Sequence, residues 1–212
     1  MKSIADDIRE SFPHKHEKLK EIVWLAELFD EHQRLIEILK GDALIALTEL
    51  QSESEENEQF IKRSFVRTTF AAIEGIMNVL KQSILGCYKI GMIELAKKDF
   101  ERLVETEESF ESLLIKPKRI PLKDMMKFIY TTYSNNMKNR EMIIDVNSPE
   151  WMAFCEGIKI RDRLTHPKTV NDLIVTQEEL NALLVASKWF FELVMSLWEL
   201  PFYPKFSSAW ST

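Results

Sequence analysis

The stretch FVRTTFAAIEGIMNVL (residues 65–80) decides the fold that the sequence predicts. Its apolar positions recur every three or four residues, which is the period of an α-helix with one buried face. The members of this face are Phe65, Thr69, Ala72, Ile73, Ile76, Met77 and Leu80. Because the face is broad, we expect residues 57–86 to form the central helix of a helical core.

Helical periodicity continues along nearly all of the chain, whereas the alternation typical of strands is almost absent. Further helices are predicted over residues 15–50, 89–108, 122–138, 149–166 and 177–199. In the first of these ranges, Gly41 marks a candidate break. The sequence therefore predicts the all-α class.

Three local signals indicate where helices begin and end. The two prolines of the basic connector KPKRIP (residues 116–121) stop a helix, because each removes a donor and restricts the residue before it. Ser148 followed by Pro149 is typical of an N-cap with proline at the first helical position. The segment TQEE (residues 176–179) predicts a capping box at the start of the last helix.

The acidic stretch SESEENE (residues 52–58) is the best candidate for a boundary between units of the chain. We expect an N-terminal helical arm over residues 1–52 and a helical bundle over residues 53–200. An aromatic, proline-containing tail follows over residues 201–212. With five glycines and seven prolines, the composition is neither that of a disordered nor that of a fibrous protein.

Composition also indicates the compartment. A chain of 212 residues is long enough to bury a core without disulfides or metals. Cys87 and Cys155 have no C-x-x-C spacing, and free thiols are typical of a reducing compartment. The N-terminus lacks the apolar core of a signal peptide, and no apolar run approaches the roughly 18–20 residues that span a bilayer. We therefore expect a cytoplasmic protein that does not enter a membrane.

Charge is distributed unevenly, although the whole chain carries a net charge of −6. Residues 1–60 hold seven basic and fifteen acidic residues, whereas residues 116–168 hold eleven basic and six acidic ones. A basic surface attracts a polyanion even on an acidic protein, because salt screens exposed charges beyond about 10 Å. The basic block is compatible with RNA as a partner, and equally with a surface that binds no ligand.

The stretch RDRLTHP (residues 161–167) lies in this basic block and is the one place where the sequence suggests a chemistry. Asp162 and His166 are four residues apart and share a helix face, with Arg161 beside them. A guanidinium matches phosphate oxygens, a carboxylate fixes the tautomer of an imidazole, and a histidine exchanges protons near neutral pH. Because RNA carries its own nucleophile, the 2′-hydroxyl, this set of groups suits metal-independent phosphodiester cleavage.

The pattern is weak by itself, since Arg9 and His14 have the same five-residue offset in an acidic segment interrupted by proline. The alternative is that Arg161 and Asp162 form a surface ion pair and that His166 caps its own helix. No histidine follows a glutamate by three positions, as a di-iron bundle requires, and phosphate-binding glycine loops are absent from the sequence. We expect no metal and no cofactor.

The motif resembles the signature of the HEPN superfamily of helical-bundle proteins: Arg, a polar residue, a few variable positions and then His at a helix end. Arg161, Asp162 and His166 match it, and the resemblance covers about residues 57–199. It implies a bundle of four to five core helices that forms a homodimer, in which two motifs build one composite, metal-independent ribonuclease site. Such proteins often act as toxins, antiphage or stress effectors, or RNA-processing enzymes.

The resemblance also implies roles for single residues. His166 would be the general acid and base, Arg161 would hold the scissile phosphate, and Asp162 would orient one or both of them. Arg163 and Lys168 would contact substrate phosphates. The expected partners are RNA, a second copy of the chain, and an antitoxin or regulatory protein.

Two alternatives stay open. Glu74, on the predicted central helix, is either a further residue of the site or, more commonly for such a position, a solvated or paired carboxylate. The chain is either this endoribonuclease or a non-catalytic helical interaction module that binds a protein or RNA partner through the same face. Some members of the superfamily are binding domains of this kind.

Overall fold

The computed structural model describes residues 17–52, 57–104, 120–138 and 143–198. Every regular element within these ranges is helical, which confirms the predicted all-α class. The elements are α2 (Glu17–Gln51), α3 (Glu58–Lys89), α4 (Lys97–Val104), α5 (Leu122–Lys138), α6 (Pro149–Thr165), the 3-10 helix η2 (Val170–Leu173) and α7 (Gln177–Trp198).

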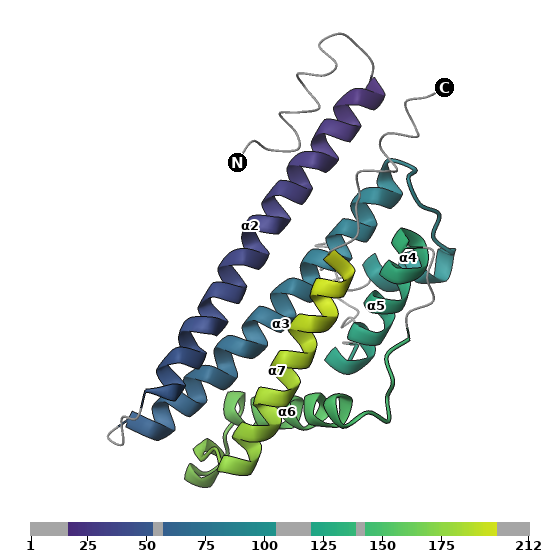
Figure 1. Cartoon of the computed structure of the whole chain (residues 1–212). Helices are drawn as coiled ribbons and strands as arrows, with labels where there is room; N and C mark the ends of the chain where they lie inside the picture. The colour runs from purple at the N-terminus through teal and green to yellow at the C-terminus, as the bar shows by residue number, and fades with distance from the viewer. Residues whose placement is uncertain (1–16, 53–56, 105–119, 139–142, 199–212) are drawn as a thin grey trace.

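Helices α2 and α3 form a long antiparallel hairpin along one side of the molecule (Figure 1). They have 35 and 32 residues, respectively. Leu25, Phe29 and Ala46 of α2 are buried in the same apolar core as the residues of α3. The helix predicted as an N-terminal arm therefore packs directly against the central helix of the bundle.

Helix α2 continues without interruption through Gly41, so the predicted break at this position is wrong. A glycine in a helix interior costs only about 1 kcal/mol relative to alanine. Leu25 and Phe29 are buried before it, and Ala43 and Ala46 after it. Full burial of a large apolar side chain such as Leu25 or Phe29 contributes about 1.5–3 kcal/mol, so the packing of α2 against α3 outweighs the cost of the glycine.

Helix α3 is the central helix, as the sequence predicts, and all seven residues of its predicted face are buried. Two of its glycines permit the close approach of α2. A Cβ atom at Gly75 would lie 2.6 Å from the Leu39 side chain, and one at Gly86 would lie 2.9 Å from Leu25 and Leu28. The hairpin is therefore packed too closely at these points for a larger side chain to enter without a shift.

The helix predicted over residues 89–108 begins only at Lys97. The preceding helix, α3, ends near Gly91, whose φ of 73° lies in the left-handed region that favours glycine. The N–H of Met92 donates to the carbonyl of Cys87 at 2.9 Å and closes this helix end. Residues 105–108 and most of the predicted basic connector, residues 116–119, lie outside the described residues.

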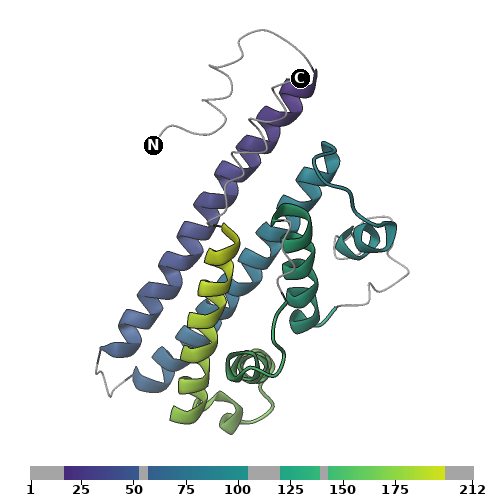
Figure 2. The same cartoon turned by 45° about the vertical axis from the view of Figure 1, so that its right-hand side comes forward.

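Helix α6 lies across α3 and α7 (Figure 1) and is seen nearly end-on in Figure 2. It begins as predicted, because the Ser148 hydroxyl accepts a hydrogen bond from the N–H of Trp151 at 3.1 Å. The fully buried Phe154 anchors it between two rings, with centroids 6.3 Å away at Phe70 and 5.7 Å away at Trp189. This packing fixes the place of the C-terminal end of α6, where the predicted motif lies.

Other expectations concern cysteines and the membrane. Both cysteines are free thiols, with Cys87 buried and Cys155 half-buried. None of the described helices combines the length and the apolar character that crossing a bilayer requires. The predicted tail, residues 201–212, lies outside the described residues.

Candidate functional site

The Arg161 guanidinium lies among carboxylates at the end of α6. It forms an ion pair with Glu74 of α3, and its Nη1 atom is 2.9 Å from Oδ1 of Asp162. The Phe70 ring lies 5.6 Å from the guanidinium carbon, and the buried Nε has no hydrogen-bond partner among the described residues. The surface ion pair that the sequence left open as an alternative is therefore present. Glu74 is a paired carboxylate, and it reaches the site.

His166 is the C-cap residue of α6. Its backbone N–H donates to the Asp162 carbonyl at 3.0 Å, and its side chain is exposed. Within the described part of the chain, the imidazole forms no hydrogen bond or ion pair. The resemblance predicts that Asp162 orients Arg161, His166 or both. Of these two residues, the Asp162 carboxylate contacts Arg161. The imidazole is therefore accessible to a ligand.

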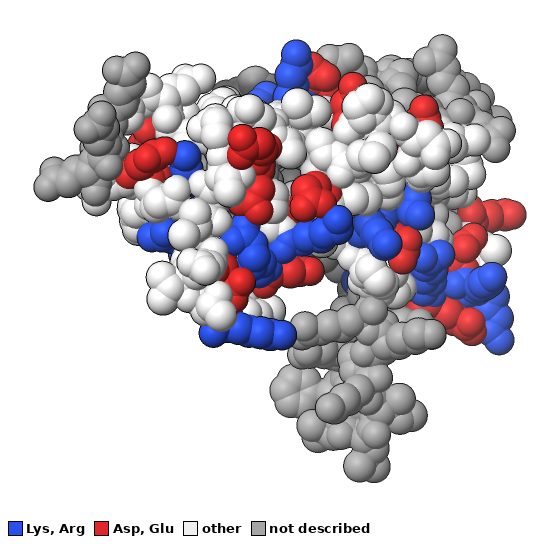
Figure 3. All heavy atoms as spheres, turned by 90° about the horizontal axis from the view of Figure 1, so that it is seen from below, with Lys and Arg blue, Asp and Glu red and all other residues white. Residues whose placement is uncertain are grey.

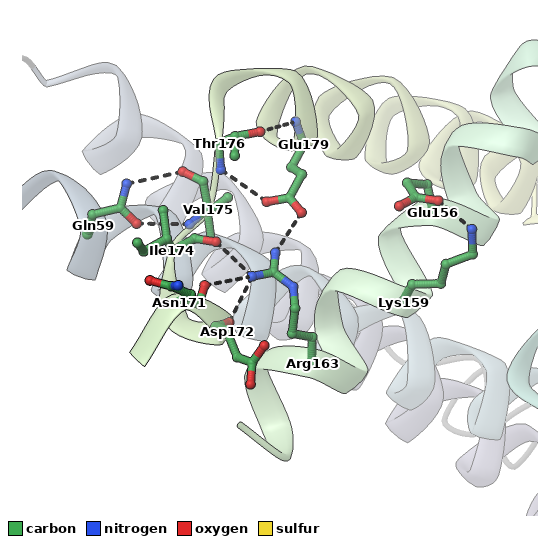
Figure 4. A network of polar contacts seen from close by, with 10 residues as sticks. All are labelled: Gln59, Glu156, Lys159, Arg163, Asn171, Asp172, Ile174, Val175, Thr176 and Glu179. Atoms are coloured by element: carbon green, nitrogen blue, oxygen red, sulfur yellow. Dashed lines mark hydrogen bonds and ion pairs between the residues drawn. The ribbon is translucent and has the colours of Figure 1, made fainter. Parts of the chain in front are cut away.

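The Arg163 guanidinium clamps the loop that leads from α6 to α7 (Figure 4). Its Nη1 donates to the carbonyls of Asn171, Asp172 and Ile174 at 3.4, 2.9 and 2.8 Å, and its Nη2 lies 2.6 Å from Oε1 of Glu179. Irregular backbone has carbonyls that no ladder satisfies, and the guanidinium supplies their donors. Arg163 thus has a structural role, and its phosphate contact stays a prediction.

Two further contacts hold this loop in place (Figure 4). The side-chain amide of Gln59 donates to the Val175 carbonyl at 3.1 Å and accepts from the Val175 N–H at 2.9 Å. The Thr176 hydroxyl accepts from the Glu179 N–H at 3.2 Å, while the Glu179 carboxylate accepts from the Thr176 N–H at 3.0 Å. The predicted capping box is therefore confirmed, and the loop is fixed at the end where α7 begins.

Lys168 extends from this loop with an exposed side chain. The backbone N–H groups of Lys168 and Thr169 both donate to Oδ2 of Asp172 at 2.8 Å. These hydrogen bonds stabilise the ionised form and lower the pKa of the Asp172 carboxyl, and the charge of Arg163 adds a smaller effect. These hydrogen bonds form a small, ordered turn that begins at Lys168, two residues after His166.

Two arginines of α3 also reach this region, although the sequence did not identify them as site residues. Nη2 of Arg67 donates to the Leu164 carbonyl at 3.3 Å, and Nη1 of Arg63 donates to the Leu173 carbonyl at 3.1 Å. The signal that points to them is helical spacing, since one stripe of α3 faces the end of α6 and its loop. The stripe consists of Arg63, Arg67, Phe70 and Glu74.

Within the described ranges, no group of three or more His, Cys, Asp or Glu residues is placed to hold a metal ion. No family model, curated protein or solved structure matches this chain. Function is therefore argued from the side chains of the site, because a helical bundle by itself implies no particular activity.

Proposed function

We propose that the protein is a metal-independent endoribonuclease of the HEPN type, with a composite site at a homodimer interface. The observation that carries the proposal is the exposed imidazole of His166, free of partners among the described residues and little more than one helical turn from Arg161. An imidazole can accept and donate a proton, and a guanidinium matches a phosphate. These are the two groups that cleavage of RNA without a metal requires of a protein.

The chemistry accounts for the proposed dimer. A base removes the proton of the 2′-hydroxyl as its oxygen attacks phosphorus, and an acid gives a proton to the departing 5′-oxygen. The products are a 2′,3′-cyclic phosphate and a free 5′-hydroxyl. One imidazole cannot be base and acid in the same concerted step, whereas a two-fold axis brings a second His166 to the site. Arg161 stabilises the charge that develops on the phosphoryl oxygens.

The partners follow from this reaction: RNA as substrate, a second copy of the chain, and an antitoxin or regulatory protein that restrains the activity. A ribonuclease without such restraint degrades the RNA of its own cell. This agrees with a role as a toxin or as an antiphage or stress effector.

A second candidate function is a non-catalytic helical module that binds a protein or RNA partner. The specific observation in its favour is the pairing of Arg161 with both Glu74 and Asp162. A phosphate must compete with two carboxylates for this guanidinium. A module that binds without cleaving can leave Arg161 paired with these two carboxylates.

The test is incubation of the native chain with a mixed RNA pool in the presence of a chelator. We expect cleavage by the native chain, with cyclic phosphate ends, and none by His166→Ala. His14→Ala is the matched control, because His14 has the same offset from Arg9 and we expect it to keep full activity. The dimer is tested by sedimentation, which should give twice the chain mass of 24.9 kDa.

Other outcomes have defined meanings. Equal inactivity of the native chain and His166→Ala favours the interaction module. Equal activity of both places the chemistry elsewhere or in a contaminant, and so contradicts the proposed role of His166.

A further inference from the structure

We infer that Arg63 and Arg67 of α3 bind the backbone phosphates of single-stranded RNA, in a track that runs beside the motif. The inference rests on the proposed function and identifies the residues that hold its polyanionic substrate. Neither arginine belongs to the sequence motif; Arg67 contacts the end of α6, and Arg63 contacts the loop that follows it.

The four arginines of this region differ in how far carboxylates balance their charge. Arg161 is paired with two carboxylates, and Arg163 with Glu179. Arg63 and Arg67 have no ion pair within the residues that the structure describes. The positive charge that remains for a phosphate is therefore mainly on α3, and not on the motif helix.

Arg63 and Arg67 each use only part of their hydrogen-bond donors within the described residues. A guanidinium has five N–H donors. Arg67 uses one of them for the Leu164 carbonyl, and Arg63 uses one for the Leu173 carbonyl. Each contact holds the guanidinium in place, and the other donors form no hydrogen bond or ion pair with the described residues. An arginine held in this way loses less conformational entropy when it binds a phosphate.

Arg67 lies close to the end of α6 at which the proposed reacting group is found. Leu164 lies two residues before His166, so Arg67 places a cation at the C-terminal end of α6, close to the proposed reacting group. The partial negative charge of a helix C-terminus repels a phosphate unless a cation covers it. Arg63 lies one turn further along α3, about 6 Å away along the helix axis. The pair is therefore suited to consecutive phosphates of a flexible strand.

The end of the molecule at which α6 lies also carries many basic side chains (Figure 3). Viewed from the end of the molecule where α6 lies, Lys and Arg side chains form a band across the face, with acidic side chains beside it (Figure 3). The exposed Lys168 in the loop after α6 adds a further ammonium without an ion pair among the described residues. A basic track that follows a backbone is the usual means of binding single strands without sequence preference.

The test is binding of a fluorescent 2′-O-methyl RNA oligonucleotide, followed by anisotropy over a series of salt concentrations. This oligonucleotide keeps its phosphates but has no free 2′-hydroxyl, so binding is measured without cleavage. We expect Arg67→Gln and Arg63→Gln each to lower the slope of log affinity against log salt concentration by about 0.7, the value for one phosphate contact with a single strand. Lys188→Gln removes the same charge from an exposed position on α7 and should leave the slope unchanged.

A merely structural role of these arginines gives a different result. Loss of a loop contact lowers the affinity without changing the salt slope, whereas loss of a phosphate contact changes both. Arg67→Lys keeps the charge and should retain the native slope. Native slopes in both glutamine variants would overturn the inference, as would a native chain that does not bind the oligonucleotide.

The two proposals fail in distinguishable ways. If the RNA pool is cleaved in a His166-dependent manner but the slopes do not change, the ribonuclease stands and the track is wrong. If the slopes change as expected but no RNA is cleaved, the track stands as part of a binding module.

Discussion

The α2–α3 hairpin and the loop between α6 and α7 are stabilised by different interactions. The hairpin is held by apolar side chains, and a polar contact also crosses it inside the core, from Nδ1 of His32 to Oγ of Ser83 at 3.0 Å. The loop is held by side-chain donors directed at backbone carbonyls, above all those of Arg163. One region depends on buried area, and the other on hydrogen bonds.

The physical reason is the backbone. A long helix satisfies its own N–H and C=O groups, so its contacts with a neighbour need only side-chain packing. A loop leaves carbonyls that require donors from elsewhere. Arginines close to a motif are therefore often structural, and a functional role has to be assigned from the charge and donors that remain.

The largest expected effect comes from removing the clamp of the loop. Arg163→Met deletes hydrogen bonds to three carbonyls and the ion pair with Glu179. We expect a loss of about 1–3 kcal/mol in the free energy of unfolding, because the side chain is partly exposed and water replaces some of its contacts. Urea unfolding measures the loss, and amide exchange across residues 166–176 should become faster.

The control for this prediction is Lys159→Met on the same helix. Lys159 forms an exposed ion pair with Glu156, and such pairs contribute little. Similar urea midpoints for the two variants would show that the loop does not depend on Arg163.

A smaller effect is expected in the hairpin and depends on pH. Burial lowers the pKa of His32 below its ordinary value, against a weaker opposing effect of Glu31. As the pH falls through the ordinary histidine range, the unfolded chain takes up a proton that the folded chain resists, so stability is lost. Between about pH 8 and about pH 5.5, the urea midpoint should fall further for the native chain than for His32→Leu.

The same comparison has an internal control. Ser83 keeps its hydrogen bond to the Val79 carbonyl at 2.9 Å in the His32→Leu variant, so no buried hydroxyl loses its last partner. An identical dependence in the native chain and in His32→Leu would show that His32 is as readily protonated in the folded chain as in the unfolded one.

The smallest effect has the opposite sign. Gly41→Ala should stabilise the protein by about 0.5–1 kcal/mol, because a Cβ atom there meets no other atom within 4 Å and alanine favours the helix. Thermal unfolding measures the gain. Gly91→Ala is the contrasting variant: its site is equally open, but its φ of 73° is strained for alanine, and we expect destabilisation.

A gain in Gly41→Ala would show that the hairpin tolerates a glycine only because packing on both sides compensates for it. A loss would indicate that another surface approaches the helix closely at this position.

Much of the fold could be predicted from periodicity and capping signals. The face of α3, the N-cap at Ser148 and the capping box at residues 176–179 are all where the sequence predicts them. The continuity of α2 could not be predicted from local signals, because it depends on burial against α3. Gly91, whose left-handed conformation lies just after α3, is by contrast a local signal that the predicted helix over residues 89–108 did not use.

The sequence by itself determined the helical class and the presence of Arg161, Asp162 and His166 at one helix end. Only the tertiary structure decided what each charge meets, because Glu74 and Arg67 of α3 are far along the chain from Arg161 and Leu164 of α6 and meet them through packing. The availability of a charged group depends on its neighbours in space, whereas the sequence specifies only its neighbours along the helix.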